Sequence, residues 1–196
     1  MQHPTKPDHD DEPVPSTRNA DRDSREFRVG RGLKYVIYFA IAVGIFMLLS
    51  RRSSGPDEGR PAADFELPAV SGTSFHLAAQ HGHPVVIEAF ASWCPTCRRT
   101  APMLADAARA QRASKVQFVG VSVDDSTAQA SAVKNAWSIP YPVLHDDGRF
   151  ARLYKITLLP TIIVIDAEGR VRHVTTGMPR RSTLEGWLAD VGAKAI

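Results

Sequence analysis

The pattern of apolar positions divides this chain into three parts: a polar start, one long apolar run, and a later alternation of predicted strands and helices. Residues 1–32 contain almost no large apolar side chains, so this segment cannot bury enough surface to offset its ordering entropy, and we predict disorder there. Residues 33–50 are almost entirely apolar and carry no charge after Lys34. A run of this length lies at the short end of the roughly 17–25 residues typical of a membrane-spanning helix, so it predicts a single transmembrane anchor.

A cleaved signal peptide is the main alternative for the apolar run. The charged segment before it is long for a signal peptide, and Arg51 and Arg52 follow it where small residues would mark a cleavage site, so we favour an uncleaved anchor. Basic residues are more numerous on its amino side than on its carboxyl side (Arg18, Arg22, Arg25, Arg28, Arg31 and Lys34 against Arg51, Arg52 and Arg60). This bias predicts a cytoplasmic amino terminus in a bacterial inner membrane, with the following domain in the periplasm.

The rest of the chain has the pattern of one α/β domain. Residues 51–61, rich in Ser, Gly and Pro, predict a flexible tether, and residues 62–196 are enough for one domain. The run at 85–90 is apolar at nearly every position, which predicts a strand buried on both faces. Further strands are predicted at 116–123, 162–165 and 171–175, and helices at 126–137 and 181–191.

The only two cysteines of the chain, Cys94 and Cys97, follow the buried strand with the spacing CxxC. A zinc site would need two further ligands at matching spacing, and the nearby candidates are three histidines upstream of the strand (His76, His81 and His83). A structural disulfide is also disfavoured, because so small a loop constrains the unfolded chain little. The net charge of +3 does not indicate a nucleic-acid site.

The position of the cysteines predicts a reactive thiol. Pro95 suits the first position of a helix, and the unpaired N–H groups and positive dipole at such a helix start would lower the pKa of the Cys94 thiol. We therefore predict Cys94 as the exposed attacking sulfur, and Cys97, one turn further on, as the shielded resolving sulfur.

Glu88 is the one carboxyl within the buried strand. Desolvation there would raise its pKa toward neutrality, so that it could exchange a proton with Cys97. The alternative is that Glu88 lies at a sheet edge in water.

Four features together resemble the thioredoxin superfamily, in particular its membrane-tethered members of the TlpA and ResA type and the cytochrome c maturation thioredoxins. They are the run from Trp93 to Cys97 after an apolar strand, Glu88 six residues before Cys94, Pro102 eight residues after it, and the run Leu159-Pro160-Thr161 before a later strand. The resemblance covers roughly residues 62–196.

The resemblance implies a thioredoxin-like fold, in which helices flank a central mixed sheet, with an amino-terminal hairpin at 65–77 and a helix and strand inserted at 126–144. It implies a cis Leu159–Pro160 bond facing Cys94, against the alternative of an ordinary trans proline, and neither cofactor nor metal. Substrate contacts are expected from residues next to the cysteines and in the proline loop: Trp93, Pro95, Thr96, Leu159 and Pro160. Some tethered relatives carry a glutamate three residues after the second cysteine, where this chain has Thr100. Glu88 is therefore expected to exchange the proton with Cys97 without help from a second acid.

The expected function is that of a thiol:disulfide oxidoreductase, most simply a reductase. The resemblance implies protein clients such as apocytochrome c or the copper-site cysteines of an oxidase, and a membrane reductase as electron donor. Alternatives are a disulfide oxidase, a copper-binding chaperone and a redox-inactive scaffold. A peroxiredoxin is rejected, because that class requires a threonine three residues before its peroxidatic cysteine and Ala91 stands there.

Overall fold

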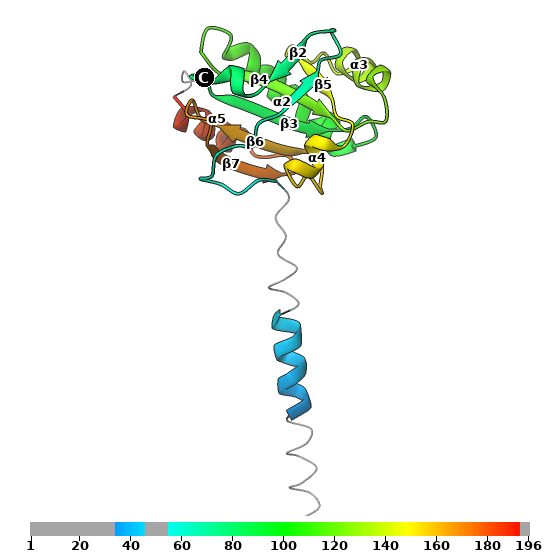
Figure 1. Cartoon of the computed structure of the whole chain (residues 1–196), viewed down its shortest axis with the longest axis vertical. Coiled ribbons are helices and arrows are strands. Elements are labelled where there is room, and N and C mark those ends of the chain that lie inside the picture. Colours follow the sequence, from blue (N-terminus) through cyan, green and yellow to red (C-terminus); the bar gives the residue numbers. More distant parts are fainter. Residues whose placement is uncertain (1–33, 46–54, 193–196) are drawn as a thin grey trace, which may run out of the picture. The chain divides into compact units, whose positions relative to one another are not determined.

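The computed structural model describes residues 34–45 and 55–192, which belong to two compact units, Met1–Arg52 and Ser53–Ile196 (Figure 1). Residues 34–45 form a helix. Within 34–45 and 55–192, no helix combines the length and the apolar character that crossing a bilayer requires. The predicted disordered tail at 1–32 and the other residues of the predicted span, 33 and 46–50, lie outside the described residues.

A five-stranded mixed sheet forms the centre of the second unit. Its strands are β3 (Val85–Phe90), β4 (Gln117–Ser122), β5 (Val143–His145), β6 (Thr161–Ile165) and β7 (Val171–Thr176), in the order β5-β4-β3-β6-β7. Strand β3 runs parallel to β4 and antiparallel to β6, and β7 is antiparallel to β6. This confirms the central mixed sheet, and it places β3 in the middle, which explains why its sequence is apolar on both faces.

Helices cover both faces of this sheet (Figure 1). They are α2 (Pro95–Ala110), α3 (Thr127–Ala136), α4 (Arg149–Leu153) and α5 (Arg181–Asp190). One core layer joins Val86 and Phe90 of β3 to Leu104 of α2 and Leu184 of α5, and it also contains both cysteines. The opposite layer joins Val85, Ile87 and Ala89 to Phe150 and Tyr154 at α4. The two layers follow from the alternation of side chains along β3.

The predicted amino-terminal hairpin is confirmed. Strands β1 (Glu66–Pro68) and β2 (Ser74–His76) pair antiparallel, and a 3₁₀ helix, η1 (Ala78–Gln80), follows. Leu67 and the side chain of Phe65 are buried in the same layer as Phe150. The helix and strand expected between the early and late parts of the fold are α3 and β5.

Residues 55–61, which we predicted to be part of a flexible tether, lie against edge strand β7 and form the edge segment. Gly59 N–H donates to the Val171 carbonyl at 2.7 Å, and Val171 N–H donates to the Arg60 carbonyl at 2.9 Å. The Glu58 carboxylate accepts from the N–H of Val174 at 2.8 Å. The physical reason is that an edge strand has unpaired backbone groups, which this segment satisfies.

Candidate active site

The two cysteines lie where β3 gives way to α2. Cys94 is the N-cap of α2 and Pro95 occupies its first turn, so the predicted helix start is confirmed. The Cys97 N–H donates to Cys94 Sγ at 3.1 Å, and the two sulfurs are joined in a disulfide. A backbone N–H aimed at Sγ would also stabilise a thiolate there after reduction.

The prediction of an exposed Cys94 is corrected by its surroundings. Only 5% of the Cys94 surface is accessible, while Cys97 is completely buried. The reason is that Cys94 packs within the core layer that contains Phe90 and Leu104. The predicted difference in exposure between the two cysteines therefore holds in direction, because Cys94 keeps a small accessible surface and Cys97 has none.

Asp124, two residues after β4, holds the loop between β3 and Cys94. Its carboxylate accepts from the Ser92 N–H at 2.9 Å, from Ser92 Oγ at 2.6 Å and from Ser122 Oγ at 2.7 Å, and the residue is 3% exposed. Because ionised acceptors make the stronger hydrogen bonds, this buried carboxylate ties the loop to the neighbouring strand. Asp124 thereby positions the residues that lead into the disulfide.

Glu88 is 2% exposed in the central strand, so the alternative of a solvated sheet edge is excluded. Tyr141 Oη donates to Glu88 Oε2 at 3.1 Å, whereas Oε1 has no hydrogen-bond partner. Burial raises the pKa of Glu88 to about 8, and the Tyr141 hydrogen bond opposes that rise. The same burial and the neighbouring carboxylate raise the pKa of Tyr141 well above its ordinary value.

Glu88 and Cys97 belong to the same side of the sheet. Along β3, Glu88 alternates with Ile87 and Ala89 and so points with Val86 and Phe90, into the core layer that contains Cys97 and Tyr141. Thr100, in the place where some tethered relatives carry an acid, is fully buried and donates from Oγ1 to the Thr96 carbonyl at 3.0 Å. Glu88 is therefore the carboxyl that the fold places in the layer of the dithiol.

The Leu159–Pro160 peptide bond is cis, as the resemblance implied. The Pro160 carbonyl accepts from the Gly177 N–H at 2.8 Å, which ties the proline loop to the end of β7. Three large apolar side chains in these loops are exposed, Trp93 at 69%, Leu158 at 59% and Met178 at 51%. Of the other predicted contact residues, Pro95 is exposed, and Thr96 and Leu159 are half-buried.

Comparison with known proteins identifies the family. The sequence model of the AhpC/TSA family matches residues 59–174, which is more than half of the chain. The chain belongs to the AhpC/TSA family.

Several relatives of this AhpC/TSA protein are named as thiol:disulfide oxidoreductases or interchange proteins. It is 24% identical over 168 residues to thiol-disulfide oxidoreductase ResA of Bacillus subtilis, a match covering 85% of this chain and 94% of that protein. It is 29% identical to thiol:disulfide interchange protein DsbE of Allochromatium vinosum, covering 72% and 80% of the two chains. A thioredoxin-family thiol:disulfide interchange protein of Chlorobium tepidum superposes with a TM-score of 0.63 at 26% identity, covering 69% and 98%. With its cysteine pair, this AhpC/TSA protein is a thioredoxin-like thiol:disulfide oxidoreductase of the ResA/DsbE type.

Sequence reasoning missed two residues of this AhpC/TSA site. Tyr141 is 53 positions from Glu88 and carries no local motif that links the two. Asp124 directly follows the strand predicted at 116–123, and the one available signal was that this strand would lie beside β3. Ala91, the residue that argued against a peroxiredoxin, is fully buried three positions before Cys94.

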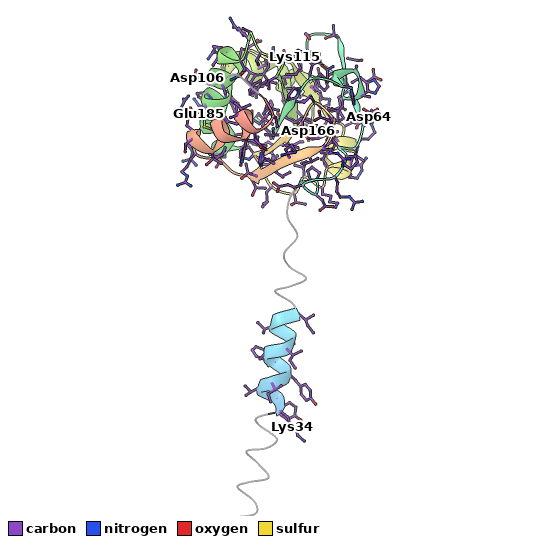
Figure 2. All side chains as sticks on the ribbon, turned by 90° about the vertical axis from the view of Figure 1, so that its left-hand side faces the viewer. Lys34, Asp64, Asp106, Lys115, Asp166 and Glu185 are labelled. Carbon is purple, nitrogen blue, oxygen red and sulfur yellow. A yellow bond between two sulfur atoms is a disulfide. The ribbon has the colours of Figure 1, made fainter. Side chains whose placement is uncertain are left out.

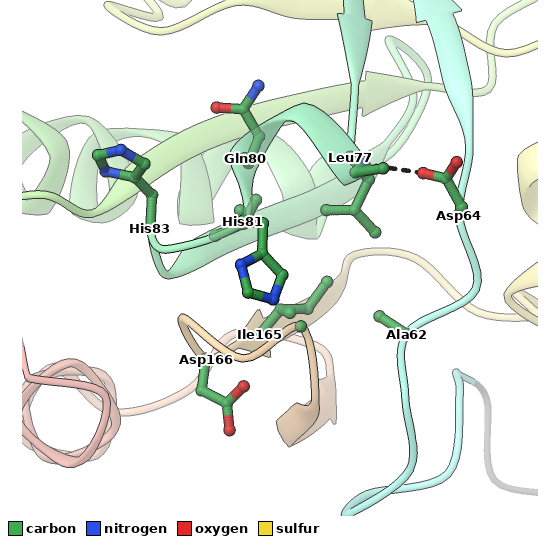
Figure 3. A pocket seen from close by; sticks show the side chains of 11 residues that line it. Ala62, Asp64, Leu77, Gln80, His81, His83, Ile165 and Asp166 are labelled. Atoms are coloured by element: carbon green, nitrogen blue, oxygen red, sulfur yellow. Dashed lines mark hydrogen bonds between the residues drawn. The ribbon is translucent and has the colours of Figure 1, made fainter.

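A separate pocket lies at the other end of the sheet of this AhpC/TSA domain. Its volume is about 120 Å³, and its lining includes Val85 at the start of β3, Ile165 at the end of β6, His81 and His83 (Figure 3). Because the disulfide follows the opposite end of β3, the pocket is not part of the dithiol site.

No group of three or more His, Cys, Asp or Glu side chains within 34–45 and 55–192 is arranged to hold a metal ion.

Proposed function

We propose that this protein is a membrane-anchored reductase of protein disulfides outside the cytoplasm. The observation that carries the proposal is the pairing of the Cys94–Cys97 dithiol with the buried carboxyl of Glu88 in one core layer. The dithiol supplies two electrons and the carboxyl can exchange a proton. Neither step requires a bound cofactor.

In the first step, the Cys94 thiolate attacks one sulfur of a client disulfide. The client S–S bond breaks, a mixed disulfide with Cys94 forms, and the second client sulfur leaves as a thiolate that takes a proton from water. In the second step, Cys97 attacks Cys94 Sγ, which forms the intramolecular disulfide and releases the first client sulfur. Two electrons have passed to the client, and a membrane reductase is the proposed donor that restores the dithiol.

Glu88 is the proposed proton acceptor for Cys97. Cys97 is fully buried, so its thiol must lose a proton to a group within the protein before it can attack. Burial raises the pKa of Glu88 to about 8, so both its ionised and its protonated forms can take part in proton exchange near neutral pH. The ionised form of Glu88 accepts this proton, and the reverse reaction returns it.

The exposed apolar side chains favour protein clients over small thiols. Trp93 precedes Cys94, Leu158 precedes the cis-proline loop, and Met178 follows Gly177, whose N–H binds the Pro160 carbonyl. Apolar side chains around a nearly buried sulfur suit an extended polypeptide, which can also pair with the Leu159 backbone by strand addition. Apocytochrome c and copper-site proteins of an oxidase are the proposed clients.

The proposed anchor is the apolar run at residues 33–50. Its described part, residues 34–45, is helical and exposes large apolar side chains such as Tyr35, Phe39 and Ile41, which a bilayer would cover. Carbonate extraction of bacterial membranes tests this anchor, since an anchored chain stays in the pellet. In spheroplasts, added protease should digest residues 55–192, and their protection would contradict the proposed orientation.

A reduction potential tests the direction of electron flow. The protein is equilibrated in dithiothreitol buffers, and the dithiol fraction is followed by alkylation of Cys94. A potential near that of thioredoxin, about −270 mV, is expected for a reductase, whereas a value near −120 mV would identify an oxidase and refute the proposal. Insulin reduction by the wild type, with Cys94→Ser as the inactive control, tests the activity itself, and equal rates for the two proteins would refute it.

A further inference from the structure

We propose that Arg99, Arg180 and Arg181 form a client-selecting cluster beside the dithiol, and that it favours clients with acidic residues next to the target cysteine. This arginine cluster deepens the proposed function and rests on it. All three side chains are exposed, and they come from α2, whose N-cap is Cys94, and from the start of α5, which an ion pair between Arg181 and Asp106 joins to α2.

The path of the chain from the proline loop to α5 places two of these arginines. Gly177 N–H donates to the Pro160 carbonyl at 2.8 Å, so this path starts at the cis-proline loop. It ends at α2, where Arg181 Nη2 lies 3.4 Å from Asp106 Oδ2. Arg180 is the N-cap of α5, directly before Arg181, and it therefore lies between the proline loop and the flank of α2.

Arg99 lies on the same flank of α2. Arg99 and Asp106 are seven positions apart, which is two helical turns and the same side of the helix. Arg99 is therefore displaced along that flank from the Arg181 contact toward the helix start, where Cys94 is the N-cap. The cluster thus extends along one side of the helix that presents the disulfide.

Two of the three arginines have no acidic partner among the residues that the structure describes. Arg99 donates only to Thr96 Oγ1, at 3.3 Å, and no ion pair involves Arg180. Arg181 shares Asp106 with Arg109, whose Nη1 lies 3.2 Å from Oδ1. Glu185, one turn after Arg181 on α5, is on the same side of the domain as Asp106 and forms no ion pair with the cluster (Figure 2). Uncompensated positive charge therefore remains at Arg99 and Arg180.

The charge on the other side of the disulfide has the opposite sign. Strand β6, which begins after the cis-proline loop, and strand β7, which ends before Arg180, lie on one side of β3, and β4 lies on the other. The exposed Asp125 follows β4, next to the Asp124 carboxylate that holds Ser92. A client with acidic residues on one side of its cysteine would pair with the arginines. A client with acidic residues on both sides would also bring some of them close to Asp125, which repels them.

The client that fits this surface is an extended segment with an apolar residue at the cysteine and acidic residues on the arginine side. Trp93 and Met178 offer the apolar contact, and the arginine cluster offers the charge. Complementary charges of this kind act on encounter rate and choice of partner more than on affinity, and they are screened by salt.

The test measures how fast the reduced protein reduces three peptide disulfides that differ only in two residues beside one cysteine, which are Glu, Gln or Lys. Neutral hydroxyethyl disulfide is the reference substrate, and each rate is divided by its rate. We expect the acidic peptide to react about 3- to 10-fold faster than the Gln peptide at low salt, with the preference falling to about 1 in 1 M NaCl. The Lys peptide should be slowest.

The double variant Arg99→Gln/Arg180→Gln should lose most of the acidic preference and its salt dependence. Arg112→Gln is the matched control, because this exposed arginine follows the far end of α2 and should leave the preference unchanged. Equal rates for the three peptides, or a preference that survives in the double variant, would overturn the client proposal while reduction of hydroxyethyl disulfide upholds the proposed function. A wild type that reduces none of the substrates overturns both.

Discussion

Replacing Glu88 by glutamine should change how the stability of the oxidised protein depends on pH. Burial raises the pKa of Glu88 from 4.5 to about 8 in the folded protein. Between these two values the native state keeps a proton that the unfolded chain releases, so the free energy of unfolding falls as the pH rises through this range, and it stops falling above about pH 8. Glutamine has no proton to release and removes this dependence.

The magnitude follows from the two pKa values. One pH unit corresponds to about 1.4 kcal/mol for a single proton, and integration from pH 5 to pH 8 with values of 4.5 and about 8 gives a loss of about 3.5 kcal/mol in the wild type. The unfolding free energy of Glu88→Gln relative to the wild type should therefore increase by about this amount over the same range. Any constant cost of placing an amide beside Tyr141 cancels in that comparison.

The assay is urea unfolding at pH 5, 6, 7 and 8, followed by tryptophan fluorescence. The protein is kept oxidised, because the disulfide-bonded Cys94 and Cys97 do not titrate in that state. Tyr141→Phe is the informative control: it retains Glu88 but loses the hydrogen bond that favours the ionised carboxylate, so the loss of stability should extend to a higher pH than in the wild type. Parallel curves for the wild type and Glu88→Gln would refute a buried, proton-holding carboxyl.

Two further substitutions test the contacts that support the site. Asp124→Asn should lower the free energy of unfolding by about 2–3 kcal/mol, because an amide has one accepting oxygen in place of the two that accept from Ser92 and Ser122. The control Asp125→Asn, at an exposed position, should change it by less than about 0.5 kcal/mol. Equal effects in urea unfolding would argue against the loop tie. Gly55→Ala should cost about 1–3 kcal/mol, since Gly55 has φ +105° and an added Cβ would lie 2.4 Å from Val174 Cγ1. Gly59→Ala, at φ +78° with nothing within 4 Å, should cost less, and equal losses of thermal stability would contradict the packing of the edge segment.

The sequence predicts the centre of this fold well because its signals are local. An apolar run of six residues predicts a buried strand, and proline after the first cysteine predicts a helix start; the structure has β3 and α2 there. The burial of Glu88 follows from the same run, since a strand with no polar face leaves an acid in the core. The cis Leu159–Pro160 bond came instead from the resemblance, because nothing in the residues around it distinguishes cis from trans.

The contacts that the sequence does not predict all join residues far apart in the chain. Tyr141 reaches Glu88 only because β5 and β3 flank β4, and Asp124 differs from Asp125 only in pointing toward the loop beside it. The edge segment was misjudged for a related reason. Its Gly and Pro residues are typical of a linker, whereas its place is set by the unpaired backbone groups of β7, which no property of residues 55–61 reveals.

Strand β3 couples the two chemical parts of the site. Its last residues lead into the loop that ends at Cys94, and its alternation directs Glu88 into the core layer of Cys97. Because the strand is paired on both sides, by β4 and β6, it cannot shift by one residue without turning Glu88 to the opposite layer and moving the start of α2. The register of one central strand therefore fixes both where the disulfide lies and which carboxyl shares its side of the sheet, so the thiol and proton chemistry depend on a single structural element.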